Sequence, residues 1–193
     1  RAWVASGVPL GTGALKEAIA RTGDPVLKNT LAWTEAVNQA VAEMVYGIPP
    51  FPFVRESMEK LKTRADLMCV SQTPAEALAR EWAEHDLTKY VRLIAGQELG
   101  SKKEHLRLAA VGKYQADHIL LIGDAYGDLE AAKENGVLFY PINPGHEEDS
   151  WQRFYEEAME RFLNGTYAGG YEESLIAEFL TYLPETPPWR KEK

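Results

Sequence analysis

The stretch ILLIGDAYGDLEAAKENG, residues 119–136, decides the fold because it joins an apolar run, a turn and a helical pattern. The apolar run ends at Gly123-Asp124, which is typical of a buried strand followed by a tight turn. A second carboxylate, Asp128, stands where the following helix begins, and Gly136 suits the end of that helix. Oxygen ligands fixed at a strand end suit Mg²⁺, so Asp124 and Asp128 are candidate metal ligands. Asp128 could instead serve only as a helix cap, but this alternative leaves Asp124 without a role.

The chain around this stretch alternates short apolar runs with helical patterns. We expect strands at 65–71, 91–96, 118–124 and 137–142, and helices at 54–63, 74–84, 102–114 and 128–135. Nearly all-apolar strands that alternate with helices are typical of a parallel sheet covered on both faces. The sequence therefore predicts an α/β fold with a Rossmann-like, doubly wound parallel sheet over residues 54–144.

Helical regions are expected on both sides of this core. Residues 14–46 are predicted to be helical, with Asp24 as the cap of the segment that runs to Tyr46. The stretch GIPPFPF, residues 47–53, is predicted to be a linker because its prolines cannot continue a helix. Residues 145–193 are predicted to be a C-terminal helical extension, in which aromatic residues at helical spacing indicate core packing.

The ends of the chain contain little that points to a ligand. The early GVPLGTG, residues 7–13, is predicted to be a loop that leads into a helix. It lacks the third glycine of a dinucleotide-binding loop and the Gly-Lys-Ser/Thr ending of a P-loop. The tail ETPPWRKEK, residues 185–193, is predicted to be loose.

Composition excludes several classes of partner. The 193 residues carry a net charge of −8, which argues against nucleic acid or an anionic membrane as the main partner. No apolar run is long enough to span a membrane. The single cysteine, Cys69, lies in an apolar run, so we expect a packed thiol and a reducing, cytoplasmic location.

The predicted strand that ends at Ser71 leads into a helix start. Thr73 is the expected cap of that helix, Pro74 its first residue, and Glu76 completes a capping box. Ser71 would then lie at the strand tip with its hydroxyl free to donate to an anion. The alternative is a serine that only stabilises the turn.

A third candidate region is Gly100-Ser101-Lys102-Lys103-Glu104. Ser101 and Glu104 form a second capping box, so both lysines fall in the first helical turn. The N-terminus of a helix is already positive, so cations there need a compensating anion. A phosphate or a cluster of carboxylates would supply it. The alternative is two solvated surface lysines.

Taken in order, VSQTP (70–74), GSKKEHL (100–106) and LLIGDAYGDLEAAKENG (120–136) resemble three motifs of one family. They are similar to the second, third and fourth motifs of the haloacid dehalogenase superfamily of hydrolases. The resemblance implies a helical cap module in residues 1–46 that covers the site.

The resemblance also implies a role for each motif residue. Ser71, with Gln72 beside it, would bind the phosphoryl group of a small phosphorylated molecule. Lys102 would neutralise the nucleophile and the phosphate, Asp124 would ligate Mg²⁺, and Asp128 would support the metal or the lysine. The implied function is a Mg²⁺-dependent phosphatase that uses an aspartyl-phosphate intermediate. We also expect loss of Lys102 to lower turnover while leaving the melting temperature nearly unchanged.

The third motif leaves one choice open. The family's spacing of serine, lysine and leucine is met by Ser101, Lys102 and Leu106, which favours Lys102 over Lys103 as the motif lysine.

The chain departs from the family in its first motif, an Asp-x-Asp that supplies the nucleophile and the general acid. No two aspartates of the chain are separated by a single residue. We expect this motif to lie upstream of Arg1, in an N-terminal segment of the same protein whose strand forms the middle of the sheet. Without that segment, the chain is expected to be inactive. The alternatives are a catalytically silent phosphate-binding protein, or a dehalogenase or phosphonatase on the same scaffold.

Overall fold

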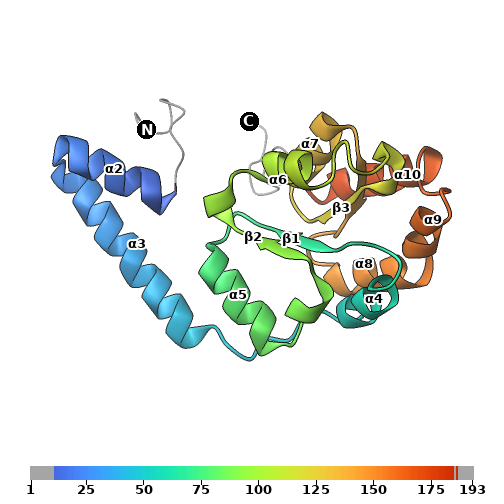
Figure 1. The fold of residues 1–193 in the computed structure, drawn as a ribbon, viewed down its shortest axis with the longest axis horizontal. Coiled ribbons are helices and arrows are strands. Elements are labelled where there is room, and N and C mark those ends of the chain that lie inside the picture. Colours follow the sequence, from blue (N-terminus) through green and yellow to red (C-terminus); the bar gives the residue numbers. More distant parts are fainter. Residues whose placement is uncertain (1–10, 185, 187–193) are drawn as a thin grey trace. The chain divides into compact units, whose positions relative to one another are not determined.

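The computed structural model describes residues 11–184 and 186, and the chain divides into two compact units at Ile48 and Pro49. The first unit contains helices α2 (Thr12–Thr22) and α3 (Pro25–Met44), which pack on each other (Figure 1). Asp24 caps α3 as predicted, because its Oδ1 accepts a hydrogen bond of 2.8 Å from the backbone N–H of Val26.

The second unit is α/β, and its strands are parallel. Strand β1 (Met68–Val70) pairs with β2 (Leu93–Ala95), and β3 (Leu120–Gly123) pairs with β4 (Leu138–Pro141). The prediction of an α/β fold with parallel strands is therefore confirmed. The described residues form two separate strand pairs, however, and each strand is shorter than predicted.

Helices and strands of the second unit alternate in the predicted order, and four of the described α-helices belong to this alternating part. They are α4 (Val54–Leu61), α5 (Ala75–Glu84), α6 (Lys102–Ala109) and α7 (Tyr126–Asn135). Helix α6 ends earlier than predicted, and Gly112 shortly afterwards has a φ of 80°, a left-handed conformation that interrupts the helical path. Helix α7 ends as predicted at Gly136, which has a φ of 65°.

The C-terminal part is helical and packs against the β3–β4 pair. It consists of α8 (Glu147–Arg153), a π-helical turn (Phe154–Ala158), α9 (Met159–Leu163) and α10 (Gly170–Thr181) (Figure 1). Phe154 and Ala158 are fully buried, which confirms that the aromatic stripe serves core packing.

Two hydrophobic clusters cover the two faces of the β3–β4 pair. Phe139 belongs to the cluster that contains Leu121 and Leu129, whereas its neighbour Tyr140 belongs to the cluster that contains Phe154. Successive residues of a strand point to opposite faces, so β4 is buried on both sides. This pair therefore provides a rigid base for the turns that follow its strands.

Some predictions fall outside the described residues. Most of the predicted loop at 7–13 and nearly all of the predicted tail at 185–193 lie there, although α2 begins within the former at Thr12. None of the helices in the described part of the chain is long and apolar enough to cross a membrane.

Candidate functional site

Helix α6 begins with the predicted capping box. The hydroxyl of Ser101 accepts a hydrogen bond of 3.3 Å from the backbone N–H of Glu104, and a carboxylate oxygen of Glu104 accepts one of 2.8 Å from the backbone N–H of Ser101. Two hydrogen bonds to the Glu104 carboxylate lower its pKa, the one from the Ser101 backbone N–H most strongly and the one from the Ser101 hydroxyl next. The box fixes the direction of the first helical turn, which carries both lysines.

The two lysines of that turn have different partners. Lys102 forms an ion pair with Asp128 of α7, which is only 1% exposed. Lys103 pairs at 2.6 Å with Glu134, and both of these side chains are about half exposed. The geometry thus places Lys102, and not Lys103, against the turn that follows β3. Each lysine is compensated in this structure by a single carboxylate, whereas the sequence predicted a phosphate or a cluster of carboxylates.

Asp128 is held between Lys102 and the end of β3. One carboxylate oxygen contacts Lys102, and the other accepts a hydrogen bond of 3.1 Å from the backbone N–H of Ala125. A Cβ atom on Gly123 would lie 2.5 Å from the Cβ and Cγ atoms of Asp128, so only glycine allows this close approach. Both oxygens of Asp128 therefore have donors, and in this structure the side chain caps α7 and positions the lysine.

Asp124 has a different environment from Asp128. It is exposed, and its carboxylate makes no hydrogen bond or ion pair with any residue that the structure describes. Within residues 11–184 and 186, no three His, Cys, Asp or Glu side chains form a group that could hold a metal ion. One free carboxylate fits a Mg²⁺ ion that takes its other ligands from water, phosphate and a further chain segment.

Ser71 continues the β1–β2 pairing and then turns. Its backbone N–H donates to the carbonyl of Ala95 at 2.9 Å, and its hydroxyl oxygen accepts a hydrogen bond of 3.1 Å from the backbone N–H of Thr73. The hydroxyl therefore stabilises the turn, as one alternative predicted. Its own proton has no acceptor among the described residues, so it remains available to donate to an anion.

The predicted cap of α5 is wrong. Pro74 occupies the cap position, and a carboxylate oxygen of Glu98 accepts a hydrogen bond of 3.0 Å from the backbone N–H of Ala75. The reason is the close approach of the turn after β2. A Cβ atom on Gly96 would lie 2.5 Å from the nitrogen of Ala75, so this turn brings Glu98 to the helix end in place of Thr73.

The same turn joins β1 to the loop before Lys102. The backbone N–H of Gln97 donates to the carbonyl of Thr73 at 3.1 Å, and the side-chain amide of Gln72 donates to the carbonyl of Gly100 at 3.2 Å. The amide nitrogen of Gln72, a predicted phosphate ligand, is therefore engaged with the backbone in this structure.

Lys102 also lies close enough to β1 to act on Cys69 electrostatically. Burial raises the pKa of the Cys69 thiol to about 11, and the positive charge of Lys102 opposes that rise. The cysteine is half-buried, as expected for a packed thiol. A chain of contacts thus connects the turn after β1, the start of α6 and the turn after β3.

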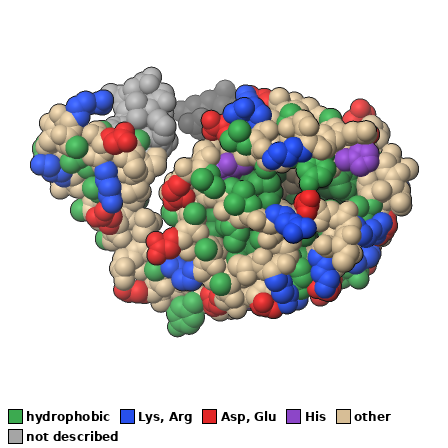
Figure 2. All heavy atoms as spheres, in the orientation of Figure 1, with side chains coloured by type: hydrophobic (Ala, Val, Ile, Leu, Met, Phe, Trp, Pro, Cys, Tyr) green, Lys and Arg blue, Asp and Glu red, His purple; other side chains and the backbone are tan. Residues whose placement is uncertain are grey.

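The surface of the second unit has a hollow in the region of β1 and β3. Figure 2 shows a hollow bordered by hydrophobic side chains, over the region where Figure 1 draws β1 and β3. Among the described residues, β1 and β3 each pair with a strand on one side only. The hollow therefore lies beside unpaired strand edges.

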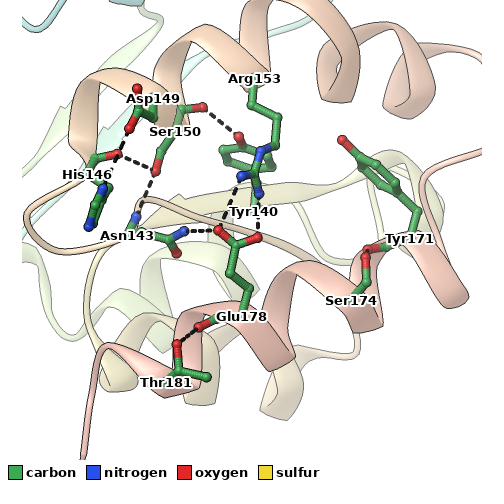
Figure 3. A network of polar contacts seen from close by, with 10 residues as sticks. All are labelled: Tyr140, Asn143, His146, Asp149, Ser150, Arg153, Tyr171, Ser174, Glu178 and Thr181. Carbon is green, nitrogen blue, oxygen red and sulfur yellow. Dashed lines mark hydrogen bonds and ion pairs between the residues drawn. The ribbon is translucent and has the colours of Figure 1, made fainter.

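A second polar network lies beyond the end of β4 (Figure 3). The guanidinium of Arg153 donates to both carboxylate oxygens of Glu178, at 2.7 and 3.2 Å, and this bonding lowers the pKa of Glu178. Asn143 donates to the same carboxylate at 2.8 Å, and Tyr140 donates to the carbonyl of Ser150 at 2.6 Å. The charged groups of this network pair with each other, so we interpret it as a structural network that holds α8 and α10 against β4.

Comparison with protein-family models, curated proteins and solved structures gave no match for this chain.

Proposed function

We propose that this chain belongs to a Mg²⁺-dependent phosphatase-type hydrolase of the haloacid dehalogenase superfamily, whose nucleophilic aspartate lies upstream of Arg1. The contact between Lys102 and Asp128 carries the proposal, because it joins the third and fourth motifs. The positive charge of Lys102 also opposes the rise in the pKa of Cys69, which lies in β1, the strand that leads to Ser71. Cationic, hydroxyl and carboxylate groups at the ends of parallel strands are suited to phosphoryl transfer.

Within the described residues, β1 pairs only with β2 and β3 only with β4, which supports a missing strand between β1 and β3. A parallel strand between them would convert the two pairs into one Rossmann-like, doubly wound sheet and would fill the hollow of Figure 2. It would also satisfy backbone groups, each of which costs about 1–3 kcal/mol when buried without a partner. The carboxyl end of such a strand would bring an Asp-x-Asp beside Ser71 and Asp124.

In the proposed reaction, the upstream aspartate attacks phosphorus, an O–P bond forms, and the ester P–O bond breaks. The leaving alcohol takes a proton from the second aspartate of the same motif, and water then hydrolyses the acyl phosphate. Lys102 offsets the negative charge on the transferring oxygens, and the free proton of Ser71 binds one of them. Asp128 holds Lys102 in position. Asp124 would ligate Mg²⁺, which when bound supplies further positive charge to the phosphoryl group.

The test is turnover by the complete protein, with its upstream segment, on p-nitrophenyl phosphate with and without Mg²⁺. We expect activity that requires Mg²⁺, and losses of at least about a hundredfold in kcat for Lys102→Met and Asp124→Asn. Lys103→Met is the matched control and should retain activity, because Lys103 pairs with Glu134 at the surface. Circular dichroism at the assay temperature would show that each variant is folded.

Three results would contradict the proposal. An upstream sequence without an Asp-x-Asp after an apolar strand would favour the silent phosphate-binding protein. Hydrolysis of haloacids without Mg²⁺ would favour the dehalogenase. Full activity of Lys102→Met would remove the assigned role of this lysine.

A further inference from the structure

Two large side chains with apolar surface are exposed on the turns that the Lys102–Asp128 ion pair brings together. Leu99 lies three residues before Lys102, and Tyr126 lies two residues before Asp128 and two after Asp124. Each of the two is 55% exposed. The ion pair joins the two turns that carry these residues, and both turns border the proposed phosphate site.

Leu99 is held in place by its backbone. It ends the 3-10 turn Gln97–Leu99, and its N–H donates to the carbonyl of Gly96 at 3.1 Å. The backbone N–H of Gln97 donates to the carbonyl of Thr73, and the carbonyl of Gly100 accepts a hydrogen bond from the side-chain amide of Gln72. The Leu99 side chain is therefore exposed on a turn whose backbone is hydrogen-bonded both before and after this residue.

Tyr126 is also fixed at its backbone. It is the first residue of α7, and the bonds between Ala125 and Asp128 set the direction of that helix start. Its hydroxyl has no hydrogen-bond partner among the described residues, so the ring and the hydroxyl are both accessible. An exposed ring of this kind offers an apolar face together with a polar tip.

Two polar side chains close to Leu99 in the chain or through a backbone contact are already hydrogen-bonded to the backbone. Glu98, which lies between Gln97 and Leu99, directs its carboxylate to the backbone N–H of Ala75. The side-chain amide of Gln72 donates to a backbone carbonyl. Neither Glu98 nor the amide nitrogen of Gln72 is therefore free to pair with a second charged group on a substrate.

We propose that Leu99 and Tyr126 contact the leaving group, and that the substrates are phosphate monoesters with an aromatic or otherwise apolar leaving group. This inference rests on the proposed phosphatase function, because it places the phosphoryl group between Ser71, Lys102 and Asp124. Burial of the apolar surface of these two side chains by the leaving group would favour binding.

The test compares two non-hydrolysable probes, phenylphosphonate and methylphosphonate, by titration calorimetry on the complete protein with Mg²⁺. We expect phenylphosphonate to bind at least about tenfold more tightly, in line with the discrimination available to apolar contacts. Leu99→Ala and Tyr126→Ala should each reduce this ratio and leave the affinity for methylphosphonate unchanged. The matched control is Leu108→Ala, whose side chain is also exposed but lies near the end of α6, away from the turn that carries Leu99.

The outcomes separate this inference from the function on which it rests. Equal affinity for the two phosphonates, or a ratio that Leu108→Ala changes as much as Leu99→Ala does, would overturn the inference and leave the phosphatase proposal standing. The binding comparison needs no turnover, so absence of hydrolysis in the assay above would count against the phosphatase proposal alone. Failure of both phosphonates to bind would overturn the inference.

Discussion

The ammonium group of Lys102 contacts the carboxylate of Asp128, although 26 positions separate the two residues in the chain. Asp128 is 1% exposed, and the side chain of Lys102 is 27% exposed. A carboxylate this deeply buried is stabilised by its partners, because it has lost most of its contact with water. The pair is therefore part of the folded structure as well as of the proposed site.

This ion pair changes the expectation drawn from the sequence, that Lys102 matters for turnover and not for folding. Lys102→Met leaves a buried carboxylate unpaired and should lower the free energy of unfolding by about 2–3 kcal/mol, somewhat less than for a fully buried pair. Lys102→Met combined with Asp128→Asn should cost less than the sum of the single changes. Urea unfolding of Lys102→Met, Asp128→Asn and the double variant measures the three losses of stability. Lys103→Met is the control and should change stability by less than about 1 kcal/mol; equal losses for the two lysine variants would contradict the role of the buried pair.

Two glycines of the same motif should respond in opposite directions to alanine. In Gly123→Ala the new Cβ would lie 2.5 Å from Asp128, so the side chain or the strand must shift, at about 1–3 kcal/mol of stability. In Gly127→Ala the new Cβ meets no atom within 4 Å, and the position is helical, so stability should rise by about 0.5–1 kcal/mol. Thermal unfolding of the two variants side by side tests this contrast, and a stable Gly123→Ala would show that the approach of Asp128 is not tight.

The cap of α5 gives a second contrast. Glu98→Ala removes the carboxylate that binds the backbone N–H of Ala75 and should cost about 1 kcal/mol. Thr73→Ala keeps the backbone bonds of that residue and should be nearly neutral. Urea midpoints of both variants measure the difference. A larger loss for Thr73→Ala would restore the cap that the sequence predicted.

Glu172 should make stability depend on pH in the direction opposite to most carboxylates. Burial raises its pKa above the usual 4.5, and the hydrogen bond from the backbone N–H of Phe139 opposes that rise only in part. The folded protein therefore binds more protons than the unfolded chain between the two pKa values, so this group's contribution to stability falls as pH rises through that window. Glu172→Gln keeps an acceptor for Phe139 and removes the charge.

The Glu172→Gln variant should gain stability over the wild type as pH rises from about 4.5, and the gain should level off above the folded pKa. Urea unfolding at a series of pH values gives this difference. The control is Glu148→Gln, an exposed carboxylate of α8, which should show no such gain. A gain that increases as pH falls would contradict the assigned direction.

The local features of the chain were predictable from its sequence. The order of strands and helices, the cap of α3 at Asp24 and the capping box of Ser101 and Glu104 all appear in the structure. Each depends on the spacing of residues only a few positions apart, which the sequence states directly. The parallel direction of the strands followed in the same way from their alternation with helices.

Only the tertiary structure decided which groups meet. In the structure, Lys102 pairs with Asp128, and Lys103 pairs with Glu134. The start of α5 is capped by Glu98 and not by the expected Thr73. The tertiary structure also arranged the strands of the described residues as two parallel pairs that are not hydrogen-bonded to each other. These outcomes depend on contacts between residues far apart in the chain, which form only where close backbone approaches, such as those at Gly96 and Gly123, bring the segments together. A sequence shows which groups are available, but their distances are set by the packing of the whole chain.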